Sequence, residues 1–323
     1  MSRVSSLIKK VFGPPKAPAP AVKKEEPTAL GMTMPTEHKF CRDYARNLYT
    51  GQGEIADLGC WMGATSISFA RGLKSNPNIP KEKRAKRIHS YDLFLWHPTM
   101  DYEVKGTELE GKFKDGESFL PEFKARTEKY EPQIAVYAGD INDHGWDGRP
   151  IEMLFVDAMK WPDTAQTILR KFYPYLVPGL SLVSHQDFAH FFTGWVHLIQ
   201  YRLREYFSVH SEVPRACTVT FKLEKAIPPE LLQMDAFLTS ATREELDAAF
   251  DWAASIVSEE KQEQIAAARA MAHVHRGELD EVPGIAKEFF WKHMNGFLYH
   301  KLFLGFERVK DAYDTAKAGL PPK

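Results

Sequence analysis

The chain has few cysteines, and this excludes two kinds of stabilising framework. Only three occur among its 323 residues, Cys41, Cys60 and Cys217. An odd number of widely separated cysteines supplies neither a set of disulfides nor a zinc-ligand cluster. The composition therefore predicts a protein of the reducing cytoplasm, whose core is formed by apolar side chains.

Charge of one sign and long apolar runs are also missing. The formal net charge is -1, so no overall basic field draws the chain to nucleic acid or to an anionic membrane. The apolar N-terminal segment 1–12 is too short to span a bilayer. It contains Lys9 and Lys10, and as an amphipathic helix it could touch a membrane surface or a partner; a frayed terminus is the alternative.

The pyrophosphate-binding pattern G-x-G-x-x-G is absent as well, which argues against a nicotinamide-dependent oxidoreductase. Present instead is D-x-G-x-x-x-G, running from Asp57 to Gly63 with the bulky Trp61 inside it. An apolar run ends at Asp57 and a helical pattern follows Gly63, so the segment predicts a strand, a tight turn and a helix. Glycines at such a turn let the backbone approach a ligand.

A carboxylate at the end of this strand suits a ligand with a free ammonium group, such as the methionine part of S-adenosylmethionine. An ordinary strand-turn-helix connection with a packing glycine is the alternative. Four further apolar runs predict strands at 87–94, 134–138, 151–156 and 180–184. Helical patterns lie at 39–49, 119–128, 162–173 and 195–206, and two antiparallel strands are expected at 208–213 and 216–223.

Polar residues follow each of the five predicted parallel strands. They are Asp57, Asp92, Asp140, Asp157, and His185 with Asp187. Because helical crossovers make neighbouring strands parallel, all of these residues are expected at one edge of the sheet. The pattern predicts an α/β protein with a Rossmann-like, doubly wound sheet of about seven strands.

Residues at this edge of the predicted sheet can be assigned contacts with parts of a ligand. Asp92 can hold ribose hydroxyls, with a turn or N-capping aspartate as the alternative. Asp140 can address an adenine amino group while Ile141 packs on the ring. The polar segment 95–117 predicts a long loop over the same edge, where such loops often gate substrates.

Three regions are expected along the chain. Residues 1–36 are rich in Pro, Ala, Lys and Glu and predict a flexible tether. Residues 37–225 form the predicted ligand-binding domain, and 226–323 a helical extension with helices at 231–237, 243–273 and 285–316. Aromatic residues crowd the last of these helices and predict a packing surface, so a homo-oligomer is expected. They are Phe289, Phe290, Trp291, Phe297, Tyr299, Phe303 and Phe306.

The motifs taken together resemble a known family. D-L-G-C-W-M-G-A-T-S, S-Y-D-L-F, A-G-D-I, F-V-D-A and L-V-P-G-L-S-L-V-S-H-Q-D-F follow one another between about Ile55 and Phe188. In this order they resemble class I S-adenosylmethionine-dependent methyltransferases, and within these the macrocin-type sugar O-methyltransferases. The resemblance implies that the cofactor's methionine end is surrounded by Asp57, Gly59, Trp61 and Gly63. It also implies that Asp92 holds ribose and that Asp140 with Ile141 binds adenine, with Asp157 at the edge of the same site.

Those sugar methyltransferases use a divalent metal held by acids after the fourth and fifth strands. Asp157 and Asp187 match two of these ligands, whereas Met159 and Gln186 stand where further acids are expected. Magnesium prefers several hard oxygen ligands, so two carboxylates and an amide would be a lean shell. A magnesium site at Asp157 and Asp187 therefore stays an open expectation.

His185 is the predicted catalytic base, with Asp187 orienting it. An unperturbed histidine pKa near 6.5 suits removal of a proton from an acceptor hydroxyl. A strand-end histidine bonded to the backbone is the alternative, and His97, His144 and His190 are lesser candidates. The predicted function is O-methylation of a sugar, glycan or small natural-product hydroxyl; the rival is an inactive methyltransferase-fold protein that binds or scaffolds.

Overall fold

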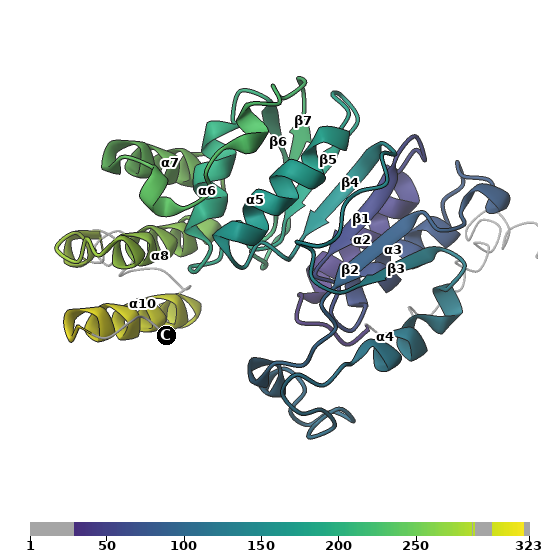
Figure 1. Cartoon of the computed structure of the whole chain (residues 1–323), viewed down its shortest axis with the longest axis horizontal. Coiled ribbons are helices and arrows are strands. Elements are labelled where there is room, and N and C mark those ends of the chain that lie inside the picture. The colour runs from purple at the N-terminus through teal and green to yellow at the C-terminus, as the bar shows by residue number, and fades with distance from the viewer. Residues whose placement is uncertain (1–28, 286, 288–298, 320–323) are drawn as a thin grey trace, which may run out of the picture.

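The computed structural model describes residues 29–285, 287 and 299–319. Its centre is a seven-stranded sheet in the order β3-β2-β1-β4-β5-β7-β6 (Figure 1). The strands are β1 (Glu54–Leu58), β2 (Ile88–Asp92), β3 (Ile134–Ala138), β4 (Ile151–Val156), β5 (Leu182–His185), β6 (Phe207–Glu212) and β7 (Val219–Leu223). The first five are parallel, and β7 runs antiparallel to both β5 and β6. The α/β class and the doubly wound sheet are confirmed.

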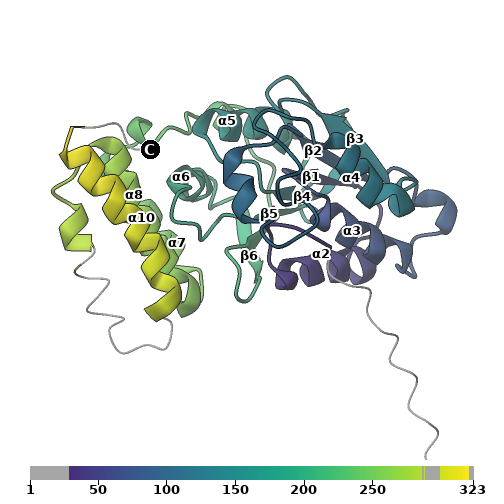
Figure 2. The ribbon, with the colours of Figure 1, turned by 90° about the horizontal axis from the view of Figure 1, so that it is seen from below.

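Helices cover both faces of this sheet (Figures 1 and 2). They are α2 (Pro35–Asn47), α3 (Ala64–Lys74), α4 (Leu120–Thr127), α5 (Pro162–Lys171) and α6 (Gly194–Arg202). Three more, α7 (Arg243–Ser255), α8 (Glu259–Arg276) and α10 (Tyr299–Lys317), form the C-terminal extension. The sequence therefore placed the helices of the sheet domain within a few residues of where they lie.

The central strand β1 is buried along its whole length. Ala56 and Leu58 pack in the same apolar cluster as α5 and α6. Ile55, which points to the opposite face, packs with residues of α2 and α3. A strand covered on both sides carries apolar residues without strict alternation, and this is why the run ending at Asp57 was recognisable as a central parallel strand.

The register brings the strand ends to one edge. Leu58 lies opposite Tyr91 of β2 and Val156 of β4, and Val156 lies opposite His185 of β5. The residues that follow these positions therefore share the carboxyl edge, as predicted. Residues 95–117 lie beyond β2 and contain only the short 3-10 helix Pro98–Tyr102.

The predicted boundary of the N-terminal tether at residue 36 falls inside a helix. Helix α2 begins at Pro35, and the Glu37 side chain accepts a hydrogen bond from the Met34 N–H at 2.6 Å. Proline in the first helical turn and an acid that satisfies a free N–H favour this earlier start. Residues 1–28, including the proposed membrane-touching segment 1–12, lie outside the described residues.

The expectation of one helix over 243–273 is wrong. The chain breaks between α7 and α8, where the Ser258 N–H and hydroxyl donate to the Glu212 carboxylate at 2.8 and 2.7 Å. This contact with β6 is remote in sequence, so local periodicity did not reveal it. The predicted helix at 231–237 is reduced to the 3-10 turn Leu231–Gln233.

Helix α10 lies alongside α8 at the end of the molecule (Figures 1 and 2). The side chains of the aromatic run from Phe289 to Phe306 are outside the described residues, so the predicted packing surface and homo-oligomer stay predictions. In the described part of the chain, no helix combines the length and apolar character needed to cross a bilayer.

Candidate functional site

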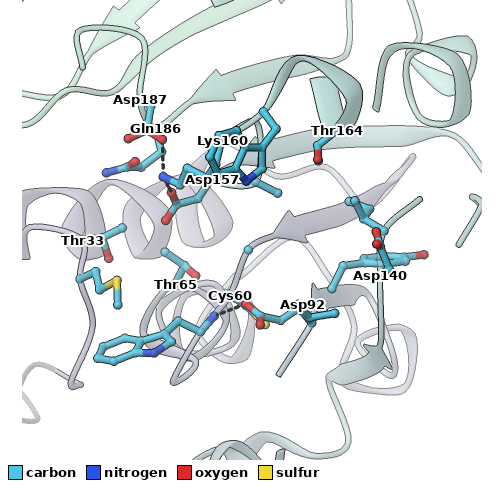
Figure 3. Close-up of a pocket in the computed structure, with 18 of the residues that line it drawn as sticks. Thr33, Cys60, Thr65, Asp92, Asp140, Asp157, Lys160, Thr164, Gln186 and Asp187 are labelled. Atoms are coloured by element: carbon cyan, nitrogen blue, oxygen red, sulfur yellow. Dashed lines mark hydrogen bonds and ion pairs between the residues drawn. The ribbon is translucent and has the colours of Figure 1, made fainter. Parts of the chain in front are cut away.

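A cavity of about 720 Å³ opens at the carboxyl edge of the sheet (Figure 3). It is lined by residues that follow β1, β2, β3, β4 and β5, and by the segment 31–33 that precedes α2. Among the residues predicted for the site, those that line it are Gly59, Trp61, Asp92, Asp140, Ile141, Asp157 and Asp187. Asp57, Gly63 and His185 do not line it.

Gly59 is required by the turn after β1. Its φ is +87°, and a Cβ there would lie 2.7 Å from the carbonyl oxygen of Asp157. The first turn of the site therefore rests directly on the end of β4. Gly63, with φ +86°, is the N-cap of α3, and a Cβ there would lie 2.9 Å from the Thr127 side chain. Its role is packing of α3 against α4, on the outer side of the turn.

Asp57 is fully buried beneath this turn. Its carboxylate accepts hydrogen bonds from the Thr65 hydroxyl at 2.8 Å and the Ser66 hydroxyl at 2.5 Å. Burial raises the pKa of Asp57 to about 6, and the two hydroxyls act in the opposite direction. The prediction that Asp57 surrounds the methionine end needs correction, because this side chain fastens α3 to β1 instead of facing the cavity.

Asp92 links the first two strand ends. One carboxylate oxygen accepts the Trp61 N–H and the other accepts the Phe94 N–H, both at 2.8 Å; Asp92 is labelled in Figure 3. Trp61 has a φ of +42°, an uncommon conformation for a bulky residue, and the bond to Asp92 stabilises it. Burial raises the pKa of Asp92, while its two backbone N–H partners oppose that shift.

The side chain of Trp61 carries a buried donor without a partner in the described part of the chain. The indole Nε1 of Trp61 has no hydrogen-bond partner among the described residues, although Trp61 lines the cavity. Buried N–H groups without partners are rare in folded proteins. An acceptor group on a ligand in the cavity would satisfy it.

Asp140 and Ile141 follow β3 and line the cavity, and Asp140 lies on the far side of it from Asp187 (Figure 3). The Asp140 carboxylate accepts the Asn142 N–H at 2.8 Å, so the turn itself orients the acid. Asp140 is exposed and Ile141 is half-buried. An apolar side chain beside an exposed acceptor is compatible with an aromatic ring that carries an amino group.

The acids after β4 and β5 have a charged partner that sequence reasoning missed. Lys160 Nζ donates to Asp157 Oδ1 at 2.6 Å and also to Asp187 Oδ2 (Figure 3). Burial acts to lower the pKa of Lys160, but the attraction of Asp157 and Asp187 outweighs it and the pKa is raised. The ammonium is therefore charged at neutral pH. Burial in turn raises the pKa of Asp157, against the attraction of Lys160.

Gln186 completes this group. With its amide nitrogen turned toward the acids, it donates to Asp187 Oδ1 at 2.6 Å and to Asp157 Oδ1 at 3.0 Å. Amide nitrogen and oxygen are assigned from such partners. Glu37 lies next to the amide, at 3.4 Å, and accepts a hydrogen bond from Thr218. Burial raises the pKa of Glu37, with Thr218 opposing the shift, and a protonated Glu37 can donate to the Gln186 oxygen.

The side chains of Asp157, Gln186 and Asp187 do not form a magnesium site. Oxygen ligands must converge on the ion, whereas the space between Asp157 and Asp187 holds an ammonium and an amide N–H. Within the described ranges, no group of three or more His, Cys, Asp or Glu side chains could hold a metal ion. The expectation of a metal at Asp157 and Asp187 therefore does not fit the residues that surround them.

His185 is a strand residue that points away from the cavity edge. Its side chain is 1% exposed, and its Nε2 lies 3.3 Å from the Tyr173 hydroxyl. Burial lowers its pKa to about 4. A group without access to an acceptor cannot take its proton, so we do not assign His185 as the base. Among the lesser candidates, only His190 lines the cavity.

Lys160 could have been noticed in the sequence, because it follows Asp157 by three residues after a predicted strand. Its importance depends on Asp187, which lies on another strand. The segment Gly31 to Thr33 carried no signal at all, since it was assigned to the tether. Gly31 lines the cavity and packs closely against Ala64, where an added Cβ would lie 2.5 Å from the Ala64 side chain.

Comparison with known proteins adds little at the level of sequence. No family model matches the chain, and no curated protein matches it. Two solved structures of CalS11 are similar in fold. The first, a calicheamicin methyltransferase, is 11% identical with a TM-score of 0.40, over 58% of this chain and 76% of that one. The second, described as an apo TDP-rhamnose 3'-O-methyltransferase of calicheamicin biosynthesis, is 14% identical with a TM-score of 0.39, over 57% and 76%. With identities of 11% and 14% and TM-scores of 0.40 and 0.39, neither similarity carries an argument about this chain.

Proposed function

We propose that the chain is an S-adenosylmethionine-dependent methyltransferase that acts on a hydroxyl of a sugar, glycan or other small molecule. The observation that carries this proposal is the meeting of the Gly59 turn and the Asp92 carboxylate in one cavity. A ligand at a topological switch point of an α/β sheet binds at this edge. The acceptor class rests on the sequence resemblance to sugar O-methyltransferases.

The residues at the first three strand ends fit the cofactor. Each carboxylate oxygen of Asp92 accepts one backbone N–H and has capacity for another bond, so the pair can accept from two adjacent ribose hydroxyls. The unpartnered Trp61 indole N–H can donate to the carboxylate of the methionine part. Asp140 and Ile141 are assigned to the adenine.

Bound at this edge, S-adenosylmethionine supplies a methyl group on a positively charged sulfur. The protein must then align the acceptor oxygen with that methyl and remove one proton. Alignment alone can contribute a large part of the rate. Asp187 and Asp157 line the cavity, and one of these carboxylates is assigned as the proton acceptor in place of His185.

Calorimetric titration with S-adenosylmethionine and S-adenosylhomocysteine, with and without magnesium, tests the proposal. We expect micromolar binding of both that magnesium does not change. Failure of both to bind would refute it. Binding of both without product, over a broad screen of hydroxyl acceptors, would favour the rival scaffold function.

A further inference from the structure

We propose that the Lys160 ammonium replaces a divalent metal in this site and binds the acceptor hydroxyl directly. The acceptor's identity rests on the function proposed above. The position of the cation rests only on the contacts of Lys160 with Asp157 and Asp187.

Two acids from different strands fix the ammonium. Asp157 follows β4 and Asp187 follows β5, and Lys160 Nζ donates to both. Their side chains are 16% and 11% exposed, so both carboxylates are largely removed from water. Gln186 donates to each of them as well. The ammonium therefore lies where a bridging metal ion would lie, with the acids as its ligands.

One donor of the ammonium remains for a ligand. An ammonium has three N–H donors, and the two carboxylates are its hydrogen-bond partners among the described residues. The Lys160 side chain is 47% exposed and lines the cavity. The third N–H therefore has no partner among the described residues, and it belongs to a side chain that lines the cavity next to two carboxylates.

The charges of Asp157, Asp187 and Lys160 suit methyl transfer to a hydroxyl group. With both acids ionised, two carboxylates and one ammonium carry a net charge of -1, since -2 plus +1 gives -1. One carboxylate can therefore accept a proton while the other stays paired with Lys160. A divalent ion added to this space would contact the ammonium, and repulsion between like charges at about 4 Å is several kcal/mol where water is partly excluded.

The proposed step conserves atoms and electrons. The acceptor O–H transfers its proton to a carboxylate oxygen of Asp187, and a lone pair of the acceptor oxygen forms the new O–C bond. The carbon–sulfur bond breaks, and its electron pair stays on sulfur as a neutral thioether. Lys160 keeps its proton throughout and donates a hydrogen bond to the acceptor oxygen as negative charge develops there.

Manganese binding, followed by electron paramagnetic resonance, tests the cation position without any turnover. The wild type should not bind Mn²⁺ at millimolar concentration. Lys160→Ala, which leaves the two carboxylates free, should bind it at least tenfold more tightly. Lys112→Ala is a matched control, because Lys112 is also 47% exposed and pairs with one acid, Glu122, at 2.6 Å; it should leave Mn²⁺ binding unchanged.

Two results would overturn the proposal. One is Mn²⁺ binding by the wild type that Asp187→Asn abolishes, since the metal would then coexist with Lys160. The other is a folded Lys160→Ala protein that still binds no Mn²⁺. If Lys160→Ala does not fold, Lys160→Gln takes its place in the experiment. The Mn²⁺ titration of the wild type tests the proposal in either case.

Activity supplies the second readout. Methyl transfer by the wild type should persist in excess EDTA, while Lys160→Ala should lose at least 100-fold in kcat with unchanged S-adenosylhomocysteine affinity. Loss of wild-type activity in EDTA would count against Lys160. Absence of S-adenosylhomocysteine binding by the wild type would instead refute the proposed function. The Mn²⁺ experiment would still test the position of the cation independently.

Discussion

The two halves of the carboxyl edge use aspartates in different ways. After β1 and β2, Asp57 and Asp92 accept hydrogen bonds from neutral hydroxyls and backbone N–H groups. After β4 and β5, Asp157 and Asp187 share one ammonium, that of Lys160. The same residue type at the same position in the fold therefore shapes a turn in one half and holds a charge in the other. Its partners decide which of these it does.

The halves touch at Gly59, and substitution there should have the largest effect. Gly59→Ala combines a left-handed φ of +87° with a Cβ 2.7 Å from the Asp157 carbonyl oxygen. Conformational strain of roughly 1–2 kcal/mol and overpacking of about 1–3 kcal/mol predict a loss of unfolding free energy of ~3 kcal/mol. Urea denaturation measures it.

Gly106→Ala is the control, because Gly106 has a φ of +77° with open space around its Cβ position. It should cost only the strain, about 1 kcal/mol. Equal losses for the two variants would show that the β1 turn does not rest on β4, and would remove the link between the halves.

A pH series with Asp57→Asn tests the half after β1 and β2, where the aspartates accept hydrogen bonds from neutral groups. The folded pKa of Asp57 is about 6 against an ordinary 3.8, so the folded state binds a proton more readily than the unfolded chain. This stabilisation is fully present below pH 3.8 and is lost as the pH rises through 6. The residue is fully buried, and two pKa units correspond to about 3 kcal/mol.

Because the amide introduced by Asp57→Asn has no proton to lose, the stability difference should move in favour of the variant by up to ~3 kcal/mol between about pH 4 and pH 7. Chemical denaturation at each pH measures it. A difference that does not change with pH would mean that Asp57 titrates normally.

Asp92→Ala tests the cofactor part of the same half. Removal of two bonds from ribose hydroxyls to a charged group should weaken S-adenosylhomocysteine binding by about 100-fold. Asp140→Ala, at an exposed acid that offers one contact, should cost roughly tenfold. Calorimetry compares them, and unchanged affinity in Asp92→Ala would defeat the ribose assignment.

Lys160→Met tests the half after β4 and β5, where two aspartates share an ammonium. It should have the smallest effect on stability. Loss of the ammonium leaves Asp157 and Asp187 without their cation, but Lys160 is 47% exposed, so solvent screening limits the cost to about 1 kcal/mol. The ammonium acts to lower the pKa of Asp157, so the loss should be greater at about pH 8 than at about pH 5. Thermal denaturation at both pH values measures it.

Lys112→Met, at a surface pair with Glu122, should cost only a few tenths of a kcal/mol. If Lys160→Met loses no more unfolding free energy than Lys112→Met, the pairing of Asp157 and Asp187 with Lys160 does not stabilise the fold.

The centre of the sheet was predictable because β1, β4 and β5 are buried along their whole length and carry polar residues at or just after their ends. β3 and β4 have the predicted bounds, and the order of strands and helices implied the shared edge. The break between α7 and α8 was not predictable, because it depends on Glu212 of a distant strand. The segment before α2 was missed for a similar reason, since its packing near Ala64 has no local signature.

For the site, the sequence by itself determined that acids and glycines would gather at one edge, because residue order and strand direction suffice for that. Only the tertiary structure decided what each acid contacts. It buried Asp57 and His185 away from the cavity and brought Lys160 between Asp157 and Asp187. Partners and burial set the charge and the accessibility of a side chain, and both depend on residues that are distant in the sequence.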